Sequence, residues 1–144
     1  TNLSGADLTN ANLKGANLST ARLSETDFTG AKLEGTILDP RNTDCAEVLE
    51  LEELELEVDG DYVYGWRTQY SEHVGNNYYV TGTVHVAPVF SVCNDTACHP
   101  GIYFSTDAYL DDNAYSLNRV RCRSLVKDCF VVNGKVRTRR LEIL

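Results

Sequence analysis

The sequence predicts a mainly β protein in two parts, a repetitive coil followed by a small mainly β (α+β) domain. Large apolar residues recur every five positions over the first 39 residues, a period that fits neither an α-helix nor a strand. All aromatic residues except Phe28 lie beyond Gly60, so the second part has the residues for a core of its own. Near the end, Asn133-Gly134 joins two β-rich runs and gives a strong signal for a β-hairpin.

The five-residue period places one large and one small residue on the inside of each side of the coil. The large residues form the expected core ladder: Leu3, Leu8, Leu13, Leu18, Leu23, Phe28, Leu33 and Leu38. Alanine or threonine stands two positions before each of them, and the residue between is polar in every unit but the last. We expect these polar residues to face water, and glycines at four corner positions to supply permissive backbone.

This pattern resembles the pentapeptide-repeat family over residues 1–39. Eight consecutive units match A-(D/N)-L-x-x, with Thr for Ala and Phe for Leu at the inward positions. The resemblance implies a right-handed quadrilateral β-helix with four units per coil, hence about two coils. It also implies a non-enzymatic scaffold or protein-interaction module, whose flat faces bind partners.

The first coil, residues 1–20, is expected to have an open edge. The sequence starts at Thr1 in an inward position within a unit and contains no methionine, so we expect upstream repeats that are missing here, or a partner that covers the edge. Unpaired backbone beside exposed Leu3, Leu8 and Leu13 would favour association. The expected partners are therefore proteins: additional repeats, or a second copy in a symmetric dimer.

Charge divides the chain into three segments. Residues 1–39 carry −2, residues 40–60 carry −7 and residues 61–144 carry +1, for a net charge of −8. We predict a repeat coil at 1–39, an acidic capping segment or linker at 40–60 and a small mainly β domain at 61–144. The acidic run is either a solvated face or an interaction surface. No apolar run is long enough to span a membrane and no signal-peptide pattern is present, which favours a cytoplasmic protein.

The segment after the repeats is expected to cap the last coil. Pro40 cannot donate to a β-ladder and should end the repeat. Asp44 and Glu47 resemble a capping box ahead of a helix through about Glu53. Residues 54–58 alternate like a strand, so helix and strand both stay open for residues 48–58.

Beyond Asp61 the patterns indicate mainly strands. We expect a strand over 62–67, a turn at 76–77, a strand run ending at Phe90 and a strand over 101–104. Ser105 or Thr106 should cap a helix over about 108–115, before the hairpin at Asn133-Gly134.

Part of this second region resembles an uncharacterised domain that follows pentapeptide repeats in proteins of large DNA viruses, phages and bacteria. Residues 98–104 with Thr106 and Ala108 resemble its C-x-x-G-I-H-F-F-x-T-x-x-x-A signature, although Tyr103 replaces the His. Residues 131–137 resemble the way such domains finish. The resemblance implies a structural component of a virion, or an adaptor in an infected or bacterial cell, without assigned chemistry.

Cysteine and histidine suggest one candidate metal site. Cys93, Cys98 and His99 form C-x4-C-H, which Cys122 or Cys129 could complete as a tetrahedral zinc site. The spacing is wider than in a usual zinc knuckle, and no second pair has metal-like spacing. We predict no bound metal, with Cys93 and Cys98 reduced or joined to each other.

An enzymatic alternative rests on a faint resemblance to ADP-ribosyltransferases, carried by Gly65–Thr68, Tyr78-Tyr79 and Val89–Ser91. The resemblance would give Arg67 and Ser91 the task of holding a nicotinamide cofactor. The catalytic Glu pair of that family has no counterpart, because Glu72 and Glu142 stand in other contexts. We therefore expect no enzyme and no cofactor, with an NAD- or nucleotide-binding domain in residues 61–144 as the alternative.

Two rows of basic residues form a candidate basic face. They are Arg119, Arg121 and Arg123 in one strand and Lys135, Arg137 and Arg139 in another. Nucleic-acid binding would need such rows beside exposed aromatic residues. Because the chain is acidic overall, we expect the rows to pair within the molecule, and nucleic acid is not an expected partner.

Overall fold

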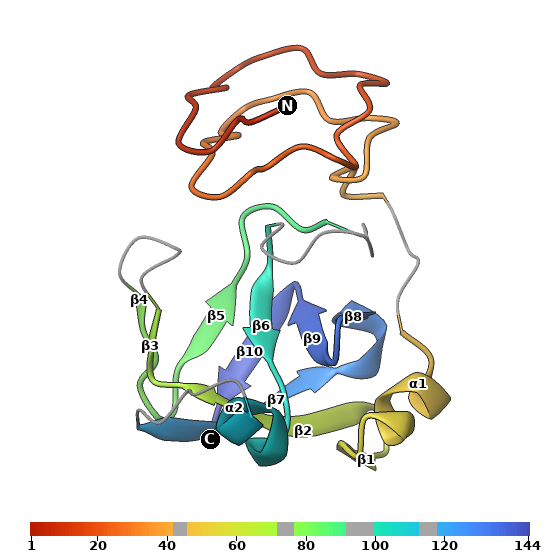
Figure 1. Cartoon of the computed structure of the whole chain (residues 1–144), viewed down its shortest axis with the longest axis vertical. Coiled ribbons are helices and arrows are strands. Elements are labelled where there is room, and N and C mark those ends of the chain that lie inside the picture. Colours follow the sequence, from red (N-terminus) through yellow and green to blue (C-terminus); the bar gives the residue numbers. More distant parts are fainter. Residues whose placement is uncertain (42–45, 72–76, 92–99, 113–117) are drawn as a thin grey trace.

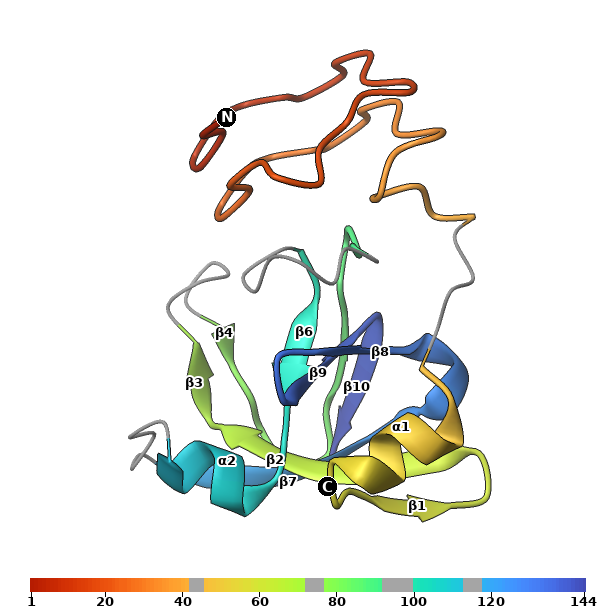
Figure 2. The same cartoon turned by 45° about the vertical axis from the view of Figure 1, so that its right-hand side comes forward.

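The computed structural model describes residues 1–41, 46–71, 77–91, 100–112 and 118–144. Its regular structure consists of short strands with two α-helices and one 3-10 turn, so the mainly β prediction is confirmed. Figures 1 and 2 show the repeats of residues 1–39 as a loop that passes round about twice above a β domain. No helix in the described part of the chain has the length and apolar character needed to cross a membrane.

Each five-residue unit closes a tight turn directly after its large residue. The carbonyl of Leu3 accepts a hydrogen bond from the Ala6 N–H at 2.9 Å, and the same bond recurs in every unit through Thr36. In six of the seven turns the third residue has a positive φ, as type II turns require, and the exception is Thr20. Glycine adopts this φ without strain, which explains Gly5, Gly15, Gly30 and Gly35.

Asparagine or aspartate in the position before the large residue has a structural task that the sequence reading missed. The Asp7 carboxylate accepts the backbone N–H of Thr9 at 3.0 Å and so fixes the turn from outside. This is the Asx-turn bond, in which an Asn or Asp side chain accepts from the backbone two residues on. The same bond forms at Asn2, Asn12, Asn17 and Asp27.

The repeats stack in two layers, which we call the first layer (residues 1–20) and the second layer (residues 21–39). Parallel bridges join Asn2 to Arg22, Asp7 to Asp27 and Asn12 to Lys32, each twenty residues apart. The second layer lies nearer the β domain (Figure 2). Four residues of the ladder are buried: Leu18, Leu23, Phe28 and Leu38. The other four are half-buried: Leu3, Leu8, Leu13 and Leu33.

Asp39 ends the repeats. Its carboxylate accepts the N–H groups of Gly35 and Arg41, each at 2.9 Å, and lies 2.8 Å from the Arg41 guanidinium. These hydrogen bonds, from Arg41 first, hold the pKa of Asp39 well below its usual range. Pro40 follows, without an N–H to continue the pattern.

The described residues of the β domain form three antiparallel sheets. The five-stranded sheet has the order β1-β2-β7-β10-β5, the three-stranded sheet β6-β9-β8 and the small sheet β3-β4. An antiparallel bridge from Trp66 to Ser105 joins the first two. The elements are α1 (Val48–Glu53), β1 (Glu57–Asp59), β2 (Tyr62–Thr68), β3 (Tyr70–Ser71), β4 (Asn77–Tyr78), β5 (Val84–Val86), β6 (Ile102–Phe104), α2 (Asp107–Asp112), β7 (Arg119–Leu125), η1 (Val126–Asp128), β8 (Cys129–Val132), β9 (Lys135–Thr138) and β10 (Arg140–Ile143).

From Ala46 on, the acidic segment packs on the β domain and not on the apolar cluster of the repeats, so the prediction that its helix caps the repeats is wrong. Leu51 of α1 and Leu56 before β1 are buried in the core of the β domain. The reason is that β1 pairs with β2, and the Ala46 N–H donates to the Cys129 carbonyl at 2.6 Å. Val89, beyond β5, packs against the apolar cluster of the repeats instead.

Residues 48–58, for which helix and strand were both left open, contain one of each: helix α1 is followed by strand β1. The helix begins after Glu47, whose N–H donates to the Glu50 carboxylate at 2.9 Å. The capping box therefore lies three residues later than expected, and Asp44 is outside the described residues.

Most other expected elements are confirmed. Strand β2 covers the expected residues, and the Thr106 hydroxyl accepts the Tyr109 N–H at 3.1 Å as α2 begins. The residues expected to continue α2 beyond 112 lie outside the described part. Hairpin β8–β9 turns at Asn133-Gly134, both with positive φ. The run expected to reach Phe90 ends as a strand at Val86, because Pro88 lacks the N–H for a further ladder bond.

Candidate interaction surfaces

The first layer of the repeats presents unpaired backbone groups. In the second layer, the Arg22 N–H donates to the Thr1 carbonyl at 3.0 Å, and its carbonyl accepts from Leu3 at 2.9 Å. The equivalent groups of Asn2, Asp7 and Asn12 have no hydrogen-bond partner among the described residues. With half-buried leucines beside them, they form an edge that a further strand can extend.

The outer face of the five-stranded sheet alternates aromatic and arginine side chains. Trp66 of β2 pairs in register with Arg121 of β7, and Tyr64 with Arg123. The Arg121 guanidinium lies 5.4 Å from the ring centre of Tyr64 and 5.6 Å from that of Trp66. Arg123 lies 4.1 Å from the ring of Tyr62. These distances are typical of cation–π contacts.

Carboxylates pair with every arginine of this first row. Arg119 bonds Asp107 and Asp111 at 2.9 and 2.6 Å, and Arg121 bonds Glu57 at 2.6 Å. Arg123 bonds Glu142 at 2.5 Å, which raises the pKa of this guanidinium. The row is therefore not a free basic face. The expected pairing with the acidic segment is confirmed for Glu57, whereas the other carboxylates come from α2 and β10.

The second basic row lies on β9 and, with Arg139, just after it, and it is not an open surface either. Arg137 is fully buried and donates to the Tyr103 hydroxyl and to the Ser91 carbonyl, each at 2.8 Å. Lys135 lies 4.5 Å from the ring centre of Tyr103, and Arg139 lies 4.7 Å from that of Phe90. This row supports the segment that approaches the repeats.

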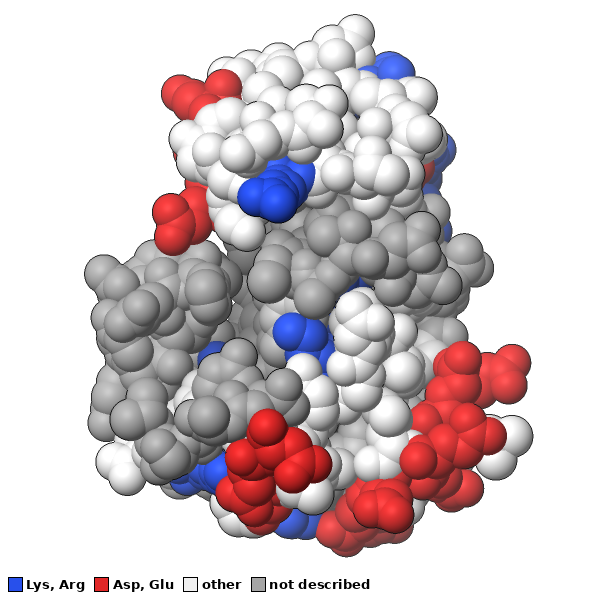
Figure 3. Space-filling view, in the orientation of Figure 1, with Lys and Arg blue, Asp and Glu red and all other residues white. Residues whose placement is uncertain are grey.

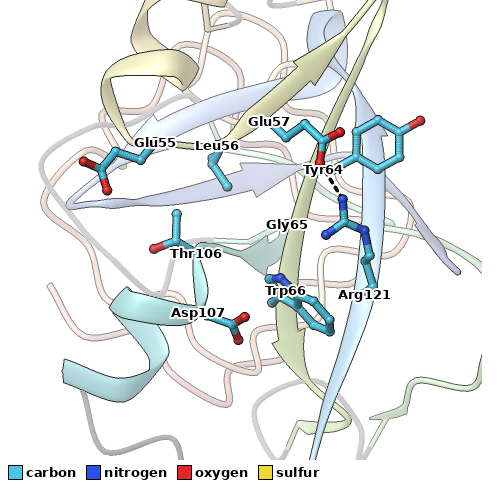
Figure 4. A pocket seen from close by; sticks show the side chains of 9 residues that line it. All are labelled: Glu55, Leu56, Glu57, Tyr64, Gly65, Trp66, Thr106, Asp107 and Arg121. Atoms are coloured by element: carbon cyan, nitrogen blue, oxygen red, sulfur yellow. Dashed lines mark hydrogen bonds and ion pairs between the residues drawn. The ribbon is translucent and has the colours of Figure 1, made fainter.

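A cavity of about 160 Å³ lies beside the outer sheet face (Figure 4). It opens between two segments that pair with the same edge of β2. Strand β1 pairs with β2 as far as Tyr64, and Ser105 forms a bridge with Trp66. Its lining comprises Glu55, Leu56, Glu57, Tyr64, Gly65, Trp66, Thr106, Asp107 and Arg121. A cavity of about 150 Å³ holds a benzene ring, and drug-sized ligands occupy about 300–1,000 Å³. This one therefore suits a side chain rather than a nucleotide.

The Arg67 side chain is buried inside the β domain, where its donors are used in hydrogen bonds to backbone carbonyls. It is 7% exposed and donates to the carbonyls of Thr68 at 3.0 Å and Tyr103 at 3.1 Å. Its guanidinium lies 3.6 Å from the ring centre of Tyr79. Ser91, the other residue of the proposed nicotinamide site, is also buried and binds Arg137 through its carbonyl. No observation favours the ADP-ribosyltransferase alternative.

The described cysteines are buried core residues. Burial raises the pKa of Cys122 to about 12, and the Cys129 thiol donates to the Leu125 carbonyl at 3.3 Å. The other candidate zinc ligands, Cys93, Cys98 and His99, lie outside the described residues. Within the described ranges, no three His, Cys, Asp or Glu side chains are grouped to hold a metal ion.

Comparison with known proteins identifies the first part of the chain. Residues 1–39 match the model of pentapeptide repeats in eight copies, which confirms that resemblance. Neither the search of curated proteins nor that of solved structures gave a match. The resemblance of residues 61–144 to a domain that follows such repeats stays a prediction.

Proposed function

We propose that this chain is a non-enzymatic structural or protein-interaction module. Its pentapeptide repeats would form about two coils of a right-handed quadrilateral β-helix, with the β domain at one end. The eight matched repeats and the parallel bridges between residues twenty apart support this reading. We propose that the protein is located in the cytoplasm, or in a virion if its source is viral. The virion alternative rests on the resemblance of residues 61–144 to the viral and phage domain.

The open first layer carries the proposal. Arg22, Asp27 and Lys32 of the second layer use their N–H and C=O groups to bond the first layer. The N–H and C=O groups of Asn2, Asp7 and Asn12, one layer further on, stand in the equivalent positions. A further layer of repeats would therefore continue the ladder and bury Leu3, Leu8 and Leu13. We propose that this layer comes from additional repeats or, in a preparation of residues 1–144 alone, from a second copy related by a twofold axis.

The test is the association state of residues 1–144. Sedimentation velocity at rising concentration should show a dimer, and the amides of Asn2, Asp7 and Asn12 should exchange more slowly as the dimer forms. Leu8→Glu places a charge on the contact and should abolish the dimer. Thr20→Glu, an exposed position in the same layer, is the matched control and should leave the dimer intact. A monomer at every concentration, with these amides already protected, would contradict the proposal.

A further inference from the structure

We propose that the cavity beside Trp66 binds a lysine or arginine side chain from a basic segment of a partner protein. We call it the acid-lined cavity, after Glu55, Glu57 and Asp107 in its wall. The proposal rests on the proposed role as an interaction module and names the chemistry of a partner at a second surface.

The molecule already places a guanidinium beside this cavity. Arg121 lies near the rings of Tyr64 and Trp66 and bonds the Glu57 carboxylate at 2.6 Å. Aromatic faces and a carboxylate are the groups that hold a desolvated cation. The same wall therefore offers a second cation the face of Trp66 and the carboxylates that Arg121 does not bond.

Asp107 beside Trp66, and Glu55 at the outer rim of the cavity, remain to receive such a cation (Figure 4). Glu55 has no ion-pair partner among the described residues, and Asp107 shares its charge with Arg119. Figure 4 shows Thr106 and Asp107 on one side of the cavity and Trp66 and Arg121 on the other. The lining carries three acidic side chains and one basic side chain, so its net charge is negative.

The surface around the cavity extends this negative charge. Residues 47–61 contain eight carboxylates and no basic residue, and α2 contributes Asp107, Asp111 and Asp112. Against these eleven charges stand Arg119 and Arg121, which leaves −9, whereas the rest of the chain carries +1. Figure 3 shows the acidic atoms gathered over α1, β1 and α2. Charge of one sign on both rims would steer a basic segment across the cavity and repel nucleic acid.

Apolar contact for the same segment is available on α1. Val48 and Leu49 are 43% and 61% exposed and stand among the glutamates of the rim. A basic segment with apolar residues beside its lysines or arginines could cover both. This combination of a central aromatic and cation pocket with a charged rim is the usual anatomy of a protein interface.

Trp66 provides the measurement, because it is the only tryptophan of the chain. Titration with a hexa-arginine peptide should change Trp66 fluorescence saturably, whereas a hexaglutamate peptide should not. Binding should be lost in 1 M NaCl, where the Debye length is about 3 Å. Glu55→Gln should weaken binding by about two- to fivefold, the usual effect of an exposed ion pair.

The control for lost charge is Glu25→Gln, an exposed carboxylate in the repeats, which should leave the affinity unchanged. If Glu25→Gln weakened peptide binding as much as Glu55→Gln, the peptide would be attracted only by the net charge, and the proposal would be overturned. An unchanged Trp66 fluorescence on addition of the peptide would also overturn it. Spermine that binds as tightly as the peptide would assign the cavity to a small polyamine and also overturn it. Leu8→Glu should not alter peptide binding, so failure here and failure of the repeat contact are separately visible.

Discussion

Phe28 should dominate the stability of the repeats. Its side chain is 5% exposed and packs in one cluster with Leu18, Leu23 and Leu38. Truncation to alanine removes most of a buried ring from a small core, and such changes typically cost about 3–5 kcal/mol. Because whole domains are stable by about 5–15 kcal/mol, this loss should leave the repeats marginal or unfolded.

Leu8 is the matched comparison, since the bridge from Asp7 to Asp27 places it in register with Phe28. It lies in the first layer and is half-buried. Leu8→Ala should therefore cost about 1–2 kcal/mol, roughly half of what a fully buried leucine loses. In the proposed dimer the two costs would approach each other, so the comparison belongs at a concentration where the chain is monomeric.

Two probes separate the parts of the molecule in urea. Amide exchange at Leu3, Leu8 and Leu13, whose N–H groups bond the second layer, follows the repeats, whereas Trp66 fluorescence follows the β domain. Phe28→Ala should lower the first transition by the stated amount and move the Trp66 transition little. A loss below 1 kcal/mol, or a loss equal to that of Leu8→Ala in the monomer, would refute the assignment of Phe28 to the repeat core.

Three further changes test other features. Gly65→Ala would place a Cβ 2.6 Å from the Phe104 ring, so the Trp66 transition should fall by about 1–3 kcal/mol, and an unchanged transition would contradict this close packing. The lowered pKa of Asp39 means that its stabilisation, complete above the usual carboxyl pKa near 4, is lost as pH falls toward the folded-state value. Asp39→Asn should therefore flatten the acid limb of the repeat transition between about pH 4 and pH 2, followed by amide exchange at Leu3, Leu8 and Leu13. Cys122, with its pKa raised to about 12, should resist iodoacetamide at pH 8 until the chain unfolds, and peptide mass spectrometry of the native protein would reveal any prompt labelling.

The features that the sequence predicted correctly are those fixed by neighbours in the chain. A turn of the repeat is closed between residues three apart, such as Leu3 and Ala6, so its period is visible without knowledge of the fold. Hairpin β8–β9 depends on Asn133-Gly134 in the same way. Capping of α2 by Thr106 is equally local.

Features fixed by distant partners could not be predicted from the pattern. The apolar face of α1 is evident in the sequence, but only the contact of Ala46 with Cys129 decides which core it joins. Alternation placed Arg137 on one face of a strand, yet the burial of that face depends on Tyr103 and Ser91, more than thirty residues away. The sequence suggested the acidic segment as a whole as the partner of the first arginine row. It did not indicate the individual partners Asp107, Asp111 and Glu142, because these are brought near the row only by the fold.

Residues 89–91, which follow β5, contact both the repeats and the β domain. Val89 packs on the repeats, while Ser91 contacts Arg137 of β9 and Phe90 contacts Arg139, which lies between β9 and β10. Buried Arg137 and half-buried Arg139 therefore support the same short segment that meets the second layer. As a result the open first layer lies at one end of the molecule, and α1, β1 and α2, which surround the acid-lined cavity, lie at the other (Figure 2). Partners bound at these two ends would not obstruct each other, so a single chain could link a repeat-containing assembly to a protein that carries a basic segment.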